Sequence, residues 1–89
     1  MREMAKGSII SCQLNFIPIG TEEYLSPIEE VLSLIKASGL EYTIGDMSTT
    51  LLGKPEKIFG LLAEINQSMS AADCNYTMTI VLSNLCGCE

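Results

Sequence analysis

The sequence predicts a single α+β domain in which strands and helices follow one another in the order βαββαβ. Two observations lead to this prediction. Apolar and polar residues alternate near both ends of the chain, as in half-buried strands, whereas two segments between them repeat apolar residues at helical spacing. The 89 residues suit one domain. Residues 1–7 are expected to form a loose segment before the first strand.

The first strand is expected over residues 8–19, where one face carries apolar side chains and the other carries Ser11, Gln13 and Asn15. A helix should follow. Ser26 has the features of an N-cap, and Glu29 stands where it completes a capping box. Gly39 supplies the left-handed residue that ends many helices. The apolar stripe of this helix consists of Ile28, Val31, Leu32 and Ile35.

The second half of the chain predicts a hairpin, a helix and a last strand. Residues 40–44 and 47–52 have strand composition, and Gly45 with Asp46 forms a turn signal between them. The second helix is expected over 55–69 and the last strand over 76–83. Right-handed crossovers then place both helices on one face of a four-stranded antiparallel sheet, which is the ferredoxin-like arrangement.

Composition argues against several classes of function. Five basic against eleven acidic residues give a net charge of −6, so neither nucleic acid nor a membrane is an expected partner. The chain has no His, which is the usual general base and the commonest metal ligand. We therefore expect no catalytic residues, no metal site and no cofactor. No export signal is recognisable, and a cytoplasmic protein is expected.

The sheet face away from the helices is expected to be nearly uncharged. Its residues include Ser, Gln, Asn and Thr side chains from the first and last strands. Hydroxyls and amides can be buried against a partner or a polar ligand at a lower cost than ions. This predicts a subunit interface of a homodimer or tetramer, a ligand pocket, or a pocket that the interface completes. Thr and Ser are also ordinary strand residues, and that interpretation stays open.

Four segments of the chain resemble the YkoF-type family, which binds thiamine and hydroxymethylpyrimidine. They are Cys12 to Pro18, Asp46 to Gly53, Ile58-Phe59 and Leu85 to Cys88. The resemblance extends over about Ser11 to Cys88. It implies a ferredoxin-like domain that binds the pyrimidine part of thiamine without enzymatic activity, in thiamine salvage or transport. Some members carry two such domains, so for this single domain it implies a homodimer or a dimer of dimers.

Asp46, Ser48 and Thr49 are the first candidates for ligand contacts. A carboxylate at position 46 can accept from an aminopyrimidine or attract a thiazolium cation, although Asp after Gly is also a common turn residue. The hydroxyls of Ser48 and Thr49 can donate to ring nitrogens, and the resemblance favours these two over Thr50. In an extended strand these two side chains point to opposite faces, and ordinary strand packing is the alternative.

Gln13, Asn15 and Tyr42 complete the predicted ligand-binding residues. The two amides can read the donor and acceptor edge of a heterocycle, and a tyrosine can stack on a flat ring. Aromatic residues in strands more often serve packing.

Two other functions stay open. The chain can be an interaction module of the same fold that assembles through its sheet face without a small ligand. It can also be a redox or metal protein that uses the thiols of Cys86 and Cys88, in which case a four-thiolate site also needs Cys12 and Cys74. The spacing of the cysteines does not favour this third function.

Overall fold

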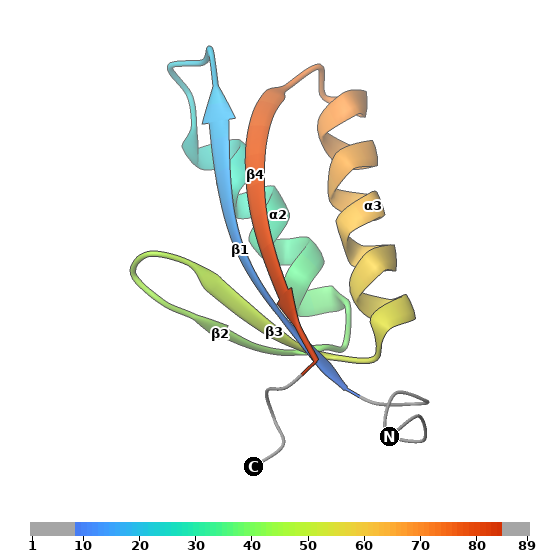
Figure 1. The fold of residues 1–89 in the computed structure, drawn as a ribbon. Coiled ribbons are helices and arrows are strands. Elements are labelled where there is room, and N and C mark those ends of the chain that lie inside the picture. Colours follow the sequence, from blue (N-terminus) through green and yellow to red (C-terminus); the bar gives the residue numbers. More distant parts are fainter. Residues whose placement is uncertain (1–8, 85–89) are drawn as a thin grey trace.

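The computed structural model describes residues 9–84 and confirms the predicted ferredoxin-like fold. Both helices lie on one side of the sheet (Figure 1). None of the helices within this range is long and apolar enough to cross a membrane. In chain order the elements are β1 (Ile10–Ile19), α2 (Leu25–Ala37), β2 (Glu41–Ile44), β3 (Thr49–Gly53), α3 (Pro55–Ala71) and β4 (Asn75–Ser83).

The four strands are all antiparallel and lie in the order β2-β3-β1-β4. Strand β1 is central, and it pairs with β4 from Ser11 to Ile19. Its pairing with β3 is shorter and stops at Leu14, which is opposite Thr49. Beyond Leu14, within residues 9–84, β1 therefore has β4 on one side and no strand on the other.

The hydrophobic core lies between the sheet and the two helices. Alternation along β1 buries Cys12 and Leu14, as the period-two pattern predicts. A fully buried Val, Leu, Ile or Met side chain contributes about 1.5 to 3 kcal/mol relative to exposure. The ten buried hydrophobic residues of the described range, nine of these types and Cys12, therefore dominate the stability of a domain this small. The helices supply Val31 and Ile35 from α2, and Ile58, Leu61, Ile65 and Met69 from α3.

The start of α2 differs from the prediction. Ser26 is not the N-cap, because the helix begins at Leu25 and Tyr24 precedes it without a side-chain cap. Instead the carboxylate of Glu23 accepts hydrogen bonds from the backbone N–H of Ser26 at 3.3 Å and from its Oγ at 3.2 Å. An acidic side chain before the helix thus takes the capping role. At the other end Gly39 has φ +82°, which confirms it as the left-handed residue after the helix.

The hairpin is also shorter than expected. Strand β3 begins at Thr49 and not at Met47, because residues 45–48 form the connecting loop. The backbone N–H of Gly45 donates to the carbonyl of Ser48 at 2.9 Å and closes this loop. Asp46 and Met47 therefore lie at the hairpin tip, and Met47 is 86% exposed.

The face of the sheet away from the helices, here called the open face, is almost uncharged. Among the strand residues in the described part of the chain only Glu41 is charged, and it lies on edge strand β2. Ile17 and Val81 are at least half exposed on this face. The register places the following side chains here: Ser11, Gln13, Asn15 and Ile17 of β1, Thr77, Thr79, Val81 and Ser83 of β4, Thr50 and Leu52 of β3, and Glu41 and Thr43 of β2.

Candidate functional site

A cavity of about 460 Å³ opens between α2, β1 and the tip of the hairpin, and we call it the hairpin cavity. It exists because β3 stops pairing with β1 at Leu14, after which the hairpin diverges from β1 toward its tip (Figure 1). One wall is apolar and comes from α2. The other carries polar groups of β1 and of the loop. The apolar wall includes Ile28, Val31, Leu32 and Ile35, and the polar residues are Asn15, Asp46, Ser48 and Thr49.

Thr49 is the most informative residue of the hairpin cavity. It is 9% exposed and is the only buried polar residue in the described range. It has no hydrogen-bond partner within residues 9–84, and no unpaired side-chain atom of that range is sealed from solvent. Its hydroxyl must therefore be reached through the cavity that it lines. This hydroxyl is thus available for a hydrogen bond with water or with a polar ligand in the cavity.

Ser48 and Asp46 lie at the rim of the same cavity. Ser48 is half-buried, and its Oγ accepts a hydrogen bond from Nε2 of Gln13 at 3.2 Å. Asp46 is exposed at the tip of the loop and is the only ionisable side chain among the described residues that line the cavity. The rim therefore combines a carboxylate and two hydroxyls.

The structure brings together most of the residues that the sequence predicts for ligand contacts. Asp46, Ser48, Thr49 and Asn15 line the hairpin cavity. Gln13 lies on the open face, outside the lining, and reaches it only through Ser48. Tyr42 lies on β2 opposite Leu51, is 39% exposed and is not part of the lining.

The apolar wall was not predicted from the sequence. Residues of α2 such as Ile28 and Leu32 follow the same stripe as the core residues Val31 and Ile35, so periodicity assigns all of them to packing. Ile44 of β2 also lines the cavity and carries no polar signal. The structure uncovers this wall because the hairpin is shorter than the sequence predicted, so its tip leaves one end of the α2 stripe uncovered.

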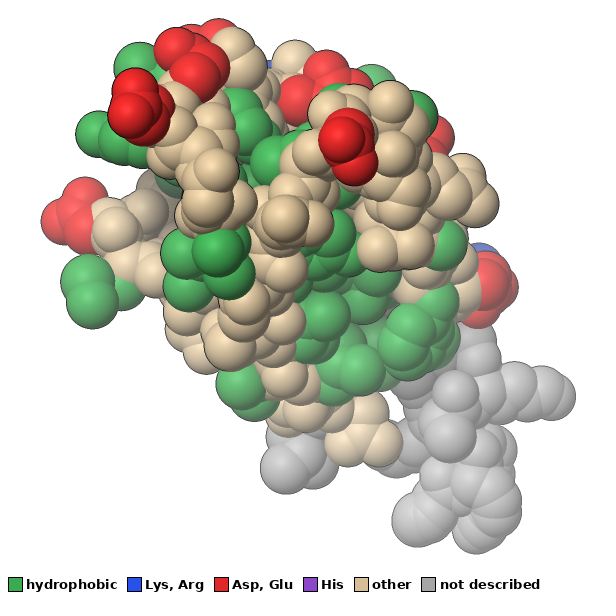
Figure 2. Space-filling view, turned by 90° about the horizontal axis from the view of Figure 1, so that it is seen from above, with side chains coloured by type: hydrophobic (Ala, Val, Ile, Leu, Met, Phe, Trp, Pro, Cys, Tyr) green, Lys and Arg blue, Asp and Glu red, His purple; other side chains and the backbone are tan. Residues whose placement is uncertain are grey.

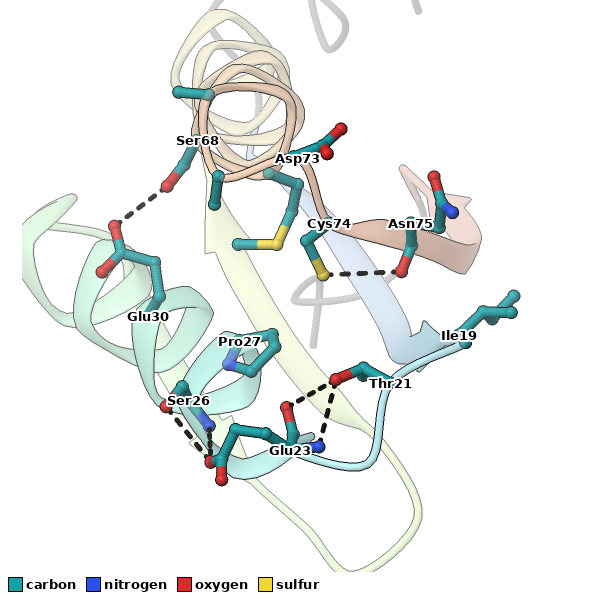
Figure 3. Close-up of a pocket in the computed structure, with 14 residues that line it drawn as sticks. Ile19, Thr21, Glu23, Ser26, Pro27, Glu30, Ser68, Asp73, Cys74 and Asn75 are labelled. Atoms are coloured by element: carbon teal, nitrogen blue, oxygen red, sulfur yellow. Dashed lines mark hydrogen bonds between the residues drawn. The ribbon is translucent and has the colours of Figure 1, made fainter.

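A larger cavity of about 640 Å³ lies at the end of the fold where β1 stops and β4 begins, between the start of α2 and the end of α3 (Figure 3). Several acidic side chains are visible at this end of the molecule (Figure 2). Several polar side chains of this larger cavity are already paired with each other. Glu23 accepts from Ser26, and Glu30 accepts from Ser68 at 3.0 Å, which links the two helices. None of the predicted ligand-binding residues lines it, so we place the candidate site in the hairpin cavity.

The cysteines are separated in the fold. Cys12 lies in the core, and burial raises the pKa of its thiol, so the neutral form is favoured. Cys74 precedes Asn75, which is opposite Ile19. Positions 12 and 19 are seven residue steps apart along β1, or about 23 Å. Cys74 lies near position 19, so one metal ion cannot bind Cys12 and Cys74 together. Cys86 and Cys88 lie outside the described residues.

Comparison with known proteins identifies the family of the chain and its fold relatives. A domain of unknown function from Bacillus cereus has a TM-score of 0.77 at 20% identity, over 89% of this chain and 78% of that one. A candidate thiamine biosynthesis/salvage protein from Thermotoga maritima has a TM-score of 0.73 at 18% identity, over 84% and 82%. A hypothetical protein from Methanocaldococcus has a TM-score of 0.75 at 17% identity, over 91% and 84%. No curated protein matches the chain. The model of the YkoF-related family matches residues 9–89, and the chain therefore belongs to that family.

Proposed function

We propose that this protein binds thiamine or its hydroxymethylpyrimidine moiety in the hairpin cavity, without chemical change, in thiamine salvage or transport. The observation that carries the proposal is Thr49, which lines a cavity with an apolar wall and whose solvent-accessible hydroxyl has no hydrogen-bond partner within residues 9–84. Family membership and the Thermotoga relative support the choice of ligand class.

The apolar wall of the hairpin cavity suits the ring faces of an aminopyrimidine, and its polar wall suits the ring edge. Its ring faces are flat and can lie against the α2 wall around Leu32, while its edge exchanges hydrogen bonds with Thr49 and Ser48. Asp46 at the rim can accept from the amino group or attract the thiazolium cation of intact thiamine. The net charge of −6 also favours a cationic ligand.

The chemistry of the rim supports binding more than catalysis. The chain has no His to act as a general base beside Ser48 or Thr49. The one described thiol in the core, Cys12, does not line the hairpin cavity and is held in its neutral form by burial. The lining groups thus offer hydrogen bonds and one negative charge.

Isothermal titration of the purified protein with thiamine and with hydroxymethylpyrimidine tests the proposal. Cytosine serves as the control ligand because it is also an aminopyrimidine but lacks the substituents of hydroxymethylpyrimidine. We expect saturable heat for thiamine, weaker or no heat for cytosine, and recovery of unchanged thiamine from the complex. Absence of binding by both thiamine-class ligands at millimolar concentration would refute the proposal.

The open face favours a second, compatible role in self-assembly. We propose that the protein forms a homodimer or tetramer in which this face is covered at least in part. The supporting observation is the uncharged composition of the face together with the exposed side chains of Ile17 and Val81. An interaction module that binds no small ligand would share this assembly but would give no heat with thiamine.

A further inference from the structure

We infer that the hairpin cavity selects the unphosphorylated ligand, and that Asp46 is the residue that discriminates against phosphate esters. This inference rests on the proposed function. It concerns which member of the thiamine class binds: free thiamine or free hydroxymethylpyrimidine, and not their phosphates.

The loop that carries Asp46 is held at the cavity rim by hydrogen bonds on both sides of this residue. The hydrogen bond from Gly45 N–H to the carbonyl of Ser48 closes the loop, and Asp46 lies between these two residues at the cavity rim. Gln13 holds Ser48 from the neighbouring strand. A ligand whose ring lies between α2 and Thr49 would thus extend its substituents past this carboxylate.

The remaining lining residues leave the charge of Asp46 uncompensated. Every other residue that lines the cavity in the described range is uncharged. Lys36 follows the lining residue Ile35 in α2 but does not itself line the cavity. Lys57 lies near Gly39, beyond the end of α2. The local field at the rim is therefore negative, in a chain whose net charge is also negative.

A phosphate group reverses the charge that the ligand presents to this rim. Thiamine carries one positive thiazolium charge, whereas a phosphate adds about −1.5 to −2 at neutral pH. Two unit charges 4 Å apart interact by about 1 kcal/mol in bulk water and more at a protein surface. Thiamine is attracted to Asp46, while its monophosphate brings a net negative charge to the same carboxylate. Neutral hydroxymethylpyrimidine should be affected least, and its phosphate should be repelled.

Titration of the intact protein with thiamine, thiamine monophosphate, hydroxymethylpyrimidine and its phosphate tests the inference. We expect each ester to bind roughly tenfold or more weakly than its parent at low ionic strength. In Asp46→Asn the dissociation constant of each ester, divided by that of its unphosphorylated parent, should fall severalfold. Glu41→Gln is the matched control, because it removes one negative charge from the same hairpin but from the open face. It should leave the ratio unchanged.

The possible outcomes separate the inference from the proposed function. Equal affinities for thiamine and its monophosphate would overturn the inference and leave the proposed function intact. The same holds if Glu41→Gln changes the ratio as much as Asp46→Asn, since net charge would then explain the selectivity. If thiamine monophosphate binds as tightly as thiamine, and its affinity falls in Lys36→Gln, then Lys36 holds the phosphate. If none of the four ligands binds, the proposed function fails, and this inference fails with it.

Discussion

Gln13 donates a hydrogen bond from Nε2 to Oγ of Ser48 at 3.2 Å, although the two residues are 35 positions apart. This bond joins the central strand β1 to the loop of the hairpin at the rim of the cavity. The hydroxyl of Ser48 accepts it and can still donate its own proton to a ligand. The rim is therefore positioned by the sheet, and not by the loop alone.

Asp46→Asn should weaken thiamine binding more than Ser48→Ala does. A lost hydrogen bond to a charged group costs about 1.5 to 3 kcal/mol, and a lost neutral one about 0.5 to 1.5 kcal/mol. Titration calorimetry on both variants measures the difference, after circular dichroism has confirmed that each is folded. If Asp46 is only a turn residue, the order of the two effects is reversed. Wild-type affinity in both variants would remove the loop from the site and leave Gln13, Asn15 and Tyr42 to be tested.

Thr49→Val should reduce thiamine affinity without reducing stability. Valine has nearly the same shape, and the hydroxyl that it replaces has no partner within the described chain. We expect a loss of about 0.5 to 1.5 kcal/mol in binding, and an unfolding free energy that is unchanged or slightly higher.

Thr50→Val is the matched control for Thr49→Val. Thr50 is the next residue of β3, but it points to the open face and does not line the cavity. The Thr50→Val variant should bind thiamine as the wild type does. Urea denaturation and calorimetry on both variants provide the comparison. A Thr49→Val protein that is destabilised and binds normally would make the hydroxyl a structural group.

Thr79→Lys should weaken self-assembly if the open face is the subunit interface. Thr79 lies near the middle of β4, opposite Asn15. An uncompensated charge forced into an interface costs about 3 to 5 kcal/mol, so the dimer should dissociate at micromolar concentration. Ala63→Lys adds the same charge on the exposed surface of α3 and should not change the mass measured by light scattering. A wild-type monomer, or a Thr79→Lys protein of unchanged mass, would contradict the assignment.

Gly53→Ala should destabilise the fold, whereas Gly60→Ala should stabilise it. A Cβ at Gly53 would collide with Cδ2 of Leu40, a core residue, and overpacking of this kind costs about 1 to 3 kcal/mol. A Cβ at Gly60 meets nothing within 4 Å, and in an exposed helix Ala is better than Gly by about 0.8 to 1 kcal/mol. Urea midpoints of the two variants should move in opposite directions. Equal urea midpoints for the two variants would show that Leu40 can move aside and make room for the added Cβ.

The fold could be predicted from the sequence because local patterns agree with tertiary packing along most of the chain. The alternation in β1 and the stripe around Ile35 each match the surface that is buried. The element ends were less predictable. At the start of α2, Ser26 and Glu29 carried a capping-box signal, but Glu23 accepts from the Ser26 N–H that Glu29 would bind in that box. Such competition depends on loop geometry that the sequence pattern does not encode.

Some polar residues that line the hairpin cavity were named from the sequence, but the shape of the cavity was not predicted. Asp46 and Ser48 are conspicuous because polar groups cluster between two apolar runs. The cavity itself depends on where β3 stops pairing with β1 and on how far α2 extends beside the gap. These are relationships between distant segments. For the same reason the sequence could not show that Tyr42, on β2, lies outside the lining of this cavity.

The long pairing between β1 and β4 affects how the chain folds while it is being synthesised. Ser11, near the beginning of the chain, pairs with Ser83, and the hydroxyl of Ser11 reaches the carbonyl of Ser83 across 72 positions. During synthesis the central strand leaves the ribosome first and its longest partner last. Until then one edge of β1 stays open, in a strand without a charged residue to discourage wrong pairing. Nascent chains that stop short of β4 would therefore expose an aggregation-prone strand and become candidates for chaperone binding.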